Sequence, residues 1–165
     1  MRIVVAGSSG LIGSALVPAL EAAGHRVERL VRPGGEAGIP WDPAAGTIDA
    51  AALEGADAVV NLAGRSIGEK RWDDAERRLI RESRVGATGL LARALAGLRR
   101  PPQVLLNASA VGFYGHRPGE RLTEDSPRGS GFFPELCADW EGATRPAAEA
   151  GTRVAWLRSG IVLSA

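Results

Sequence analysis

The chain has 165 residues, of which 45% are hydrophobic, and its formal net charge is +1. This length corresponds to one domain, residues 1–165, with enough apolar side chains for a substantial core. The near-neutral charge without a basic stripe argues against a nucleic-acid partner, and the lack of a signal peptide or long apolar run predicts a cytoplasmic protein with no membrane partner.

The N-terminal segment has the pattern of a strand, a glycine turn and a helix. Ile3–Ala6 is wholly apolar, as strands buried in parallel sheets are. Apolar residues at helical spacing then continue to Ala23, and Gly24 is a helix stop. Pro18 lies inside this helix and predicts a kink rather than an end. Between strand and helix lies a G-x-x-G-x-x-G run, made of Gly7, Ser8, Ser9, Gly10, Leu11, Ile12 and Gly13.

This context predicts a dinucleotide-binding turn. Gly7 would let the chain turn off the strand, Gly10 would let backbone N–H groups approach a pyrophosphate, and Gly13 would let the helix pack close to the sheet. The helix N-terminus would supply N–H donors and a partial positive charge. The alternative is a glycine-rich turn that binds no ligand.

The middle of the chain continues with strands and one long helix. Arg26–Val31 alternates apolar and charged residues and predicts a second strand. Residues 33–56 are rich in Gly, Pro and Ala and predict a surface excursion with little regular structure. Ala56–Gly64 predicts another apolar strand that runs into a turn, and a long helix is expected from about Asp73 to Leu98.

The last third repeats the alternation. After Pro101 and Pro102, Val104–Ala108 predicts a buried strand, followed by a polar loop over 112–131. A helix from about Phe132 to Ala150 and a strand over Val154–Leu157 complete the chain. Strands that alternate with helices predict an α/β fold of the Rossmann type, a doubly wound parallel sheet with helices on both faces.

Two residue types that often mark special chemistry are sparse. Cys137 is the only cysteine, which excludes an internal disulfide and a multi-cysteine zinc site. His25 and His116 are far apart in the sequence and have no companions at ligand spacing. No metal site is therefore predicted.

Several segments together resemble the extended short-chain dehydrogenase/reductases, and most closely an atypical group known as epimerase-family proteins. Such proteins are close to twice this long, so the resemblance implies the NAD(P)-binding part without the C-terminal half that helps build the substrate pocket. The matching segments are GSSGLIGS at 7–14, VVNLAG at 59–64, SRVGAT at 83–88, SAVGFYG at 109–115, LTEDSP at 122–127, FFPELCADWE at 132–141 and RSGIVLS at 158–164.

The resemblance implies further cofactor contacts beside the glycine run. Leu62, Ala63 and Gly64 would lie along the adenine and its ribose, Arg84 would contact the cofactor from the long helix, and Ile161 would approach the nicotinamide carboxamide through its backbone. The alternatives are core packing at a strand end for Leu62 and Ala63, and a solvated helix charge for Arg84.

The end of the second strand bears on the phosphate state of the cofactor. NAD is usually recognised there by an Asp or Glu that holds the ribose hydroxyl. Here the strand ends in Val31 and Arg32, so no carboxylate repels a 2′-phosphate and a guanidinium is available to bind it. We therefore predict NADP(H) over NAD(H). The alternative for Arg32 is an ordinary surface arginine.

The catalytic positions depart from the wider superfamily, which uses a serine and a Tyr-x-x-x-Lys pair. Ser109 fits the serine position, with Ala110 as a competing alignment. Phe133 and Cys137 stand where the tyrosine and lysine would be, so neither the proton donor nor the cationic ribose anchor is present. The atypical group tends to lack this pair.

Two other side chains could take part in proton transfer. Tyr114 could supply a phenolic proton or serve as an aromatic wall of the pocket, and Glu135 is a weaker candidate. Cys137 lies on one apolar face with Phe133 and Trp140, which favours a buried core thiol. The sequence thus predicts an NADP(H)-dependent oxidoreductase or epimerase with Ser109 and Tyr114 as catalytic residues and an unknown small-molecule substrate. The alternative is a non-catalytic NADP(H)-binding sensor.

Overall fold

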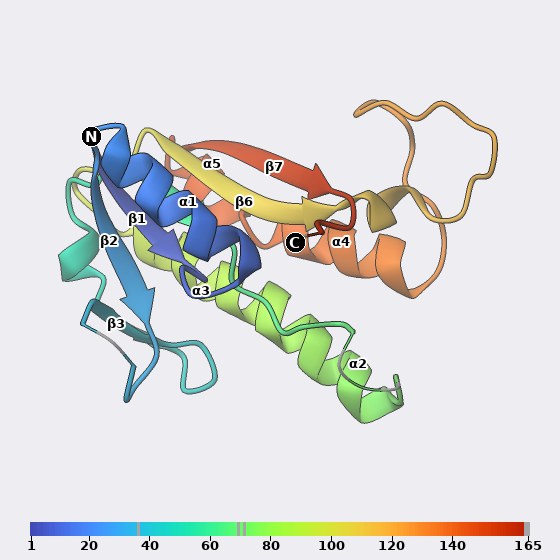
Figure 1. The fold of residues 1–165 in the computed structure, drawn as a ribbon, viewed down its shortest axis with the longest axis horizontal. Coiled ribbons are helices and arrows are strands. Elements are labelled where there is room, and N and C mark those ends of the chain that lie inside the picture. The colour runs from blue at the N-terminus through green and yellow to red at the C-terminus, as the bar shows by residue number, and fades with distance from the viewer. Residues whose placement is uncertain (36, 69, 71, 164–165) are drawn as a thin grey trace.

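The computed structural model describes residues 1–35, 37–68, 70 and 72–163. Seven strands form one sheet in the order β4-β3-β2-β1-β5-β6-β7, parallel except for the antiparallel pair of β3 and β4 (Figure 1). This confirms the predicted doubly wound sheet. The strands are β1 Arg2–Ala6, β2 Arg26–Val31, β3 Ile39–Asp42, β4 Thr47–Ile48, β5 Ala58–Asn61, β6 Val104–Ala110 and β7 Arg153–Ser159.

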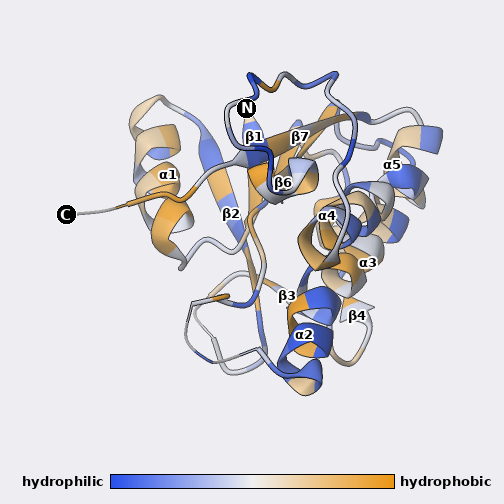
Figure 2. Cartoon of the chain, turned by 90° about the vertical axis from the view of Figure 1, so that its right-hand side faces the viewer, coloured by the Kyte–Doolittle hydropathy of each residue, from blue (hydrophilic) through white to orange (hydrophobic). Residues whose placement is uncertain are grey.

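Helices cover both faces of the sheet, as predicted. Figure 2 shows α1 on one side and α3, α4 and α5 on the other. The helices are α1 Leu11–Ala22, α2 Asp74–Arg81, α3 Ala87–Ala96, α4 Phe132–Gly142 and α5 Arg145–Glu149, with a π-helical segment Glu82–Gly86 and short 3₁₀ segments Ala51–Leu53 and Val111–Tyr114.

Strand β1 divides the core into two layers because its side chains alternate between the faces. Val4 and Ala6 belong to the layer that also contains Leu91 of α3. Ile3 and Val5 belong to the layer under α1, with Val17. Burial on both faces explains why this strand is apolar throughout.

Helix α1 continues past Pro18 and ends at Ala22, followed by Gly24 in the left-handed region at φ +81°. Not all apolar residues of this helix face the core. Gly13 and Val17 are buried, whereas Leu11 and Ile12 are 52% and 42% exposed at the first turn. These two side chains therefore lie at the surface where the glycine run was predicted to bind a ligand.

The prediction of little regular structure over 33–56 is wrong. This stretch contains β3, β4 and a 3₁₀ segment, and it supplies core side chains. Trp41 is 5% exposed and Leu53 is fully buried. β3 and β4 are too short to show a period of apolar residues, and the Gly and Pro content of the segment indicated loops. Burial of Trp41 stabilises these strands although their local propensity does not favour them.

The two predicted long helices are each interrupted. The helix predicted from about Asp73 to Leu98 is helical from Asp74 to Ala96, but a π-helical segment separates α2 from α3. The predicted 132–150 helix is wrong at its middle, because α4 ends at Gly142 and α5 begins at Arg145. Pro146 lacks the N–H that a continuous helix would need at this point.

Candidate functional site

The carboxyl ends of the parallel strands bring most of the predicted site residues to one edge of the sheet. Ala6 at the end of β1 pairs with Leu30 of β2 on one side and with Asn61 of β5 on the other. The order in which successive strands are added to the sheet therefore reverses at β1. Ligands of doubly wound folds bind at such a switch point.

The glycine turn lies at this switch point, and two of its glycines have no room for a side chain. Gly7 has φ +76°, and a Cβ atom there would lie 2.7 Å from the backbone carbon of Leu62. A Cβ atom on Gly13 would lie 2.2 Å from the carbonyl oxygen of Gly7. The start of α1 therefore packs directly on the turn, as predicted for Gly13.

The N-terminus of α1 fits a phosphate group. Gly10 occupies the N-cap and has no side chain that could cap the helix, and the first turn contains no acidic residue. Ser9 and Gly10 are exposed, while Ser8 is buried at 8%. The first N–H groups of a helix lack backbone acceptors and carry partial positive charge, so this exposed terminus suits the pyrophosphate of a dinucleotide.

Arg32 and the segment after β5 flank the turn. Arg32 directly follows β2 and is exposed. Leu62 and Ala63 are half-buried and pack against the two core layers, so the core-packing alternative holds for both without excluding a ligand. Gly64 is exposed. The structure thus places both predicted cofactor segments beside the glycine turn.

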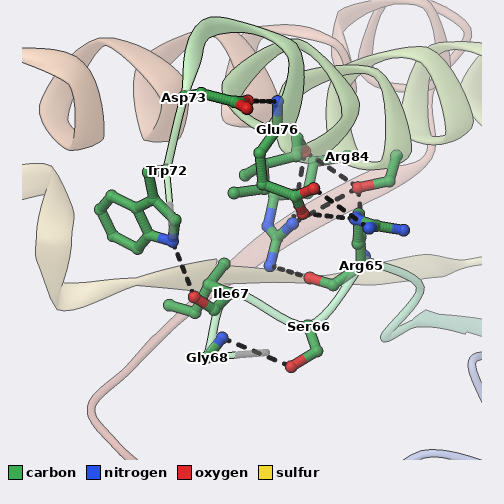
Figure 3. A network of polar contacts seen from close by, with 10 residues as sticks. Arg65, Ser66, Ile67, Gly68, Trp72, Asp73, Glu76 and Arg84 are labelled. Carbon is green, nitrogen blue, oxygen red and sulfur yellow. Dashed lines mark hydrogen bonds and ion pairs between the residues drawn. The ribbon is translucent and has the colours of Figure 1, made fainter. Parts of the chain in front are cut away.

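Arg84 is not a solvated helix charge, so that alternative is wrong. It lies in the π-helical segment, where its Nη2 donates to the carbonyl oxygen of Arg65 at 2.9 Å (Figure 3). Its guanidinium lies 5.3 Å from the ring centroid of Trp140, and burial lowers its pKa. A Cβ atom on Gly64 would lie 3.3 Å from Arg84 Cζ, so Arg84 borders the segment predicted to follow the adenine ribose.

A second set of contacts, which the sequence did not reveal, anchors the loop that follows Gly64. Arg65 donates from Nε to Glu76 Oε1 at 2.5 Å, and this hydrogen bond lowers the pKa of the Glu76 carboxyl. Trp72 Nε1 donates to the carbonyl oxygen of Ile67 at 2.8 Å (Figure 3). The loop is thereby held against α2.

The two predicted catalytic residues belong to one buried polar network. Ser109 Oγ donates to Glu141 Oε1 at 2.7 Å. Arg158 donates from Nε and Nη2 to the two oxygens of Glu141, each at 2.8 Å, and from Nη1 to Tyr114 Oη at 3.0 Å. Ser109 and Tyr114 are 5% and 7% exposed. Arg158 was not among the site residues predicted from the sequence, although an arginine within an otherwise apolar strand is a signal that could have pointed to it.

The two residues that replace the Tyr and Lys pair have different surroundings: Cys137 is buried, whereas Phe133 belongs to a cluster of aromatic rings. Cys137 is 2% exposed, and burial raises the pKa of its thiol, which fits the predicted core thiol. Phe133 packs edge-on against Trp72 with ring centroids 4.8 Å apart. Together with Phe132 these rings line a hollow of about 400 Å³, which we call the aromatic hollow. Gly112 and Gly115, on either side of Tyr114, also line it.

The remaining predictions concern Ile161, Glu135, metal ligands and membrane-spanning helices. Ile161 follows β7 by two residues and is 93% exposed. Glu135 is exposed in the first turn of α4. Within residues 1–35, 37–68, 70 and 72–163, no three His, Cys, Asp or Glu side chains are grouped to hold a metal ion. Across the same residues, no helix has the length and apolar composition to cross a membrane.

A family model described as the NAD dependent epimerase/dehydratase family matches residues 3–131. The chain belongs to this family. An epimerase family protein of Mycobacterium bovis is 46% identical over 164 residues, which cover 98% of this chain and 54% of that protein. The chain therefore spans about half the length of the curated relatives that it matches.

Solved structures of related proteins share the fold. The human epimerase family protein SDR39U1, crystallised with NADPH, has a TM-score of 0.86 and 37% identity, covering 99% of this chain and 55% of that one. A nucleoside-diphosphate sugar epimerase from Corynebacterium glutamicum has a TM-score of 0.83 and 43% identity, covering 99% and 34%. A short-chain dehydrogenase/reductase superfamily protein of Agrobacterium tumefaciens with bound NAD has a TM-score of 0.71 and 28% identity, covering 96% and 48%.

Proposed function

We propose that this protein is an NADP(H)-dependent oxidoreductase or epimerase of the short-chain dehydrogenase/reductase type, acting on a carbonyl or hydroxyl group of a small molecule. The observation that carries the proposal is the arrangement at one sheet edge, where an uncapped helix N-terminus lies on the same side as the Ser109 and Tyr114 network. The first feature suits a dinucleotide and the second can handle a proton.

The cofactor would be held by groups already in place. The N-terminus of α1 would bind the pyrophosphate, and Leu62, Ala63 and Arg84 would border the adenosine part. Arg32, exposed at the end of β2, would bind the 2′-phosphate. Related structures contain NADPH in one case and NAD in another, so the preference for NADP(H) rests on Arg32. When bound, the dinucleotide supplies the hydride chemistry of the reaction.

The substrate would lie beside Ser109 and Tyr114 and extend into the aromatic hollow. Trp72, Phe132 and Phe133 form apolar walls, and the Arg77 guanidinium lies 5.7 Å from the ring centroid of Phe132. Such a surface favours a substrate with an apolar or planar portion. If that portion carries negative charge, the Arg77 guanidinium would form an ion pair with it.

Calorimetric titration with NADPH and NADH tests the cofactor assignment. Arg32→Ala should weaken NADPH by about 1.5–3 kcal/mol, the contribution of a charged hydrogen bond, and leave NADH almost unchanged. Arg26→Ala is the matched control, because Arg26 lies at the opposite end of the same strand. If Arg32→Ala weakens both cofactors equally, Arg32 does not recognise the phosphate.

Turnover separates the enzyme from the alternative. NADPH oxidation should be screened with small carbonyl compounds, using this chain and the longer Mycobacterium bovis relative. Consumption of NADPH that depends on the carbonyl compound would support the enzyme. Tight NADPH binding without turnover in either protein would support the alternative, a non-catalytic binding protein. The similar proteins give no support to that alternative.

A further inference from the structure

Three segments that lie far apart in the sequence build the aromatic hollow. Trp72 and Arg77 come from the beginning of α2 and the loop before it, a second group follows β6, and a third lies at the start of α4. The volume of about 400 Å³ lies within the usual range of small-molecule sites, which is about 300–1,000 Å³. Gly112 closely follows Ser109 in the chain, so the hollow borders the segment that carries the candidate serine.

The aromatic walls of the hollow are held in fixed positions. The rings of Trp72 and Phe133 pack edge to face with centroids 4.8 Å apart, and those of Phe132 and Phe133 do so at 5.5 Å. The indole N–H of Trp72 donates to the carbonyl oxygen of Ile67 at 2.8 Å, which fixes the orientation of this ring (Figure 3). Because the rings brace one another, a ligand does not have to order them when it binds.

The loop that closes the hollow is also fixed, at its return toward α4. The backbone N–H of Gly129 donates to the carbonyl oxygen of Phe113 at 3.0 Å. Gly129 packs so closely on the carbonyl oxygen of Tyr114 that a Cβ atom would not fit. This contact sets Ser130 and the start of α4 against the segment that follows β6.

The polar side chains that line the hollow are hydrogen-bond donors. Besides Trp72, whose N–H is already bonded, they are Arg77, His116 and Ser130. A guanidinium only donates, and an imidazole and a hydroxyl each have a proton to donate. Among the described residues that line the hollow, none is Asp or Glu. The lining therefore suits a ligand that combines an apolar body with hydrogen-bond acceptors.

The position of Arg77 favours a negatively charged ligand over a positively charged one. Aromatic faces attract cations, but the guanidinium of Arg77 already lies 5.7 Å from the ring centroid of Phe132 and would repel a second cation. Arg77 also pairs with Asp74 at 3.7 Å, but the Asp74 side chain is 89% exposed, so this is a weak surface contact. A guanidinium has enough N–H groups to bind a ligand carboxylate beside such a contact.

We propose that the aromatic hollow binds a planar aromatic carboxylate, and that the substrate carries such a group. The ring of the ligand would pack against the three aromatic side chains, and its carboxylate would accept hydrogen bonds from Arg77. A cationic ligand would be repelled by Arg77, and a saturated one would lose the contacts between rings. The inference rests on the proposed function only in naming the ligand as the substrate.

Nuclear magnetic resonance can test the hollow directly, with 2-naphthoate as the probe. The chain has four tryptophans, and the variant Trp72→Phe assigns the indole N–H signal of Trp72. Naphthoate should shift this signal and the backbone N–H signals of Gly112 and Gly115. It should bind about threefold or more tightly than neutral 2-naphthamide, because a half-exposed ion pair contributes a modest free energy. Decahydro-2-naphthoate, which keeps the charge without the aromatic ring, should also bind more weakly than naphthoate.

Three variants separate the ion pair from a general effect of charge. Arg77→Met should weaken naphthoate by about threefold or more and leave naphthamide unchanged, because only naphthoate is charged. Arg78→Met is the matched control, since Arg78 is exposed on the same helix and is not among the residues that line the hollow. It removes the same charge and should leave both affinities unchanged. Asp74→Asn removes a competing carboxylate and should bind naphthoate at least as tightly as the unchanged protein.

Equal affinities for naphthoate and naphthamide, or equal losses in Arg77→Met and Arg78→Met, would overturn the inference. The titrations need no cofactor, so the two proposals fail separately. A preference for naphthoate at the hollow of a protein that does not bind NADPH would support the inference about the hollow and contradict the proposed function. NADPH binding without that preference would support the proposed function and contradict the inference.

Discussion

Gly10 and Gly13 lie three residues apart, yet the space available for a side chain differs between them. A Cβ atom on Gly10 would lie 3.4 Å from its nearest neighbour, the Gly7 carbonyl oxygen, which is ordinary van der Waals contact. On Gly13 the same atom would lie 2.2 Å from that oxygen, which no adjustment of a side chain can relieve because both partners are backbone. The first glycine is therefore open for a ligand, and the second is required by the fold.

We expect Gly10→Val to remove NADPH binding while the thermal unfolding midpoint changes little, because the new side chain occupies the space above the helix N-terminus. Gly13→Ala should lower the unfolding midpoint and reduce folded yield, because the turn and helix can no longer pack. Calorimetry with NADPH and thermal unfolding by circular dichroism measure the two effects. Equal NADPH affinity in Gly10→Val and the unchanged protein would remove the glycine turn from the site.

At the scale of elements, the segment from α2 to α3 depends on how its first turn is capped. The Asp73 side chain accepts a hydrogen bond from the backbone N–H of Glu76 at 2.7 Å. This contact satisfies one of the N–H groups that a helix start leaves without a backbone partner. Glu76 in turn receives Arg65, so the same turn anchors the loop that carries Trp72.

Asp73→Ala should therefore lower the free energy of unfolding by about 0.5–2 kcal/mol, the usual cost of losing an N-cap. Asp74→Ala is the matched control, because the Asp74 side chain is 89% exposed and its pairing with Arg77 at 3.7 Å is a surface contact. That variant should change the free energy by less than about 0.5 kcal/mol. Urea unfolding of both variants measures the difference, and equal losses would argue against the cap.

At the scale of the whole molecule, an ion pair joins the first two strands to the segment before β5. Arg2 donates from Nε and Nη2 to Glu28 of β2, and from Nη1 to the carbonyl oxygen of Glu54 at 2.9 Å. The hydrogen bond from Arg2 is the main cause that holds the pKa of Glu28 below its usual value of 4.5. Because the folded pKa is the lower one, the stabilisation is complete above the unfolded pKa and is lost as the pH falls through the folded value.

The free energy of unfolding should accordingly fall as the pH is lowered below about 4.5, where the unfolded chain takes up protons more readily than the folded one. Glu28→Gln removes this contribution, so its stability should decline less steeply over the same range. Urea unfolding at several pH values between about 3 and 6 gives both curves. Two parallel curves would show that Glu28 does not contribute to the acid sensitivity of the fold.

The sequence by itself determined the features that arise from neighbouring residues. Runs of apolar residues and their periods predicted β1, β2, β5, β6 and β7, because burial on one or two faces imposes those periods. The order strand, glycine turn, helix predicted the local shape around Gly7 and Gly13, because a tight turn and close packing exclude any other residue there. The same patterns were sufficient to recognise the family.

Only the tertiary structure decided the features that depend on residues far apart in the chain. Trp41 and Leu53 became core residues because the first strands offered them an apolar face, although their own segment has no readable period. Arg158 meets Glu141 and Tyr114 only because β7 pairs with β6 in one register, and a shift of that register by one residue would turn its side chain to the opposite face. A local pattern fixes which way a residue faces within its element, whereas the partner that it meets is fixed by how the elements pack.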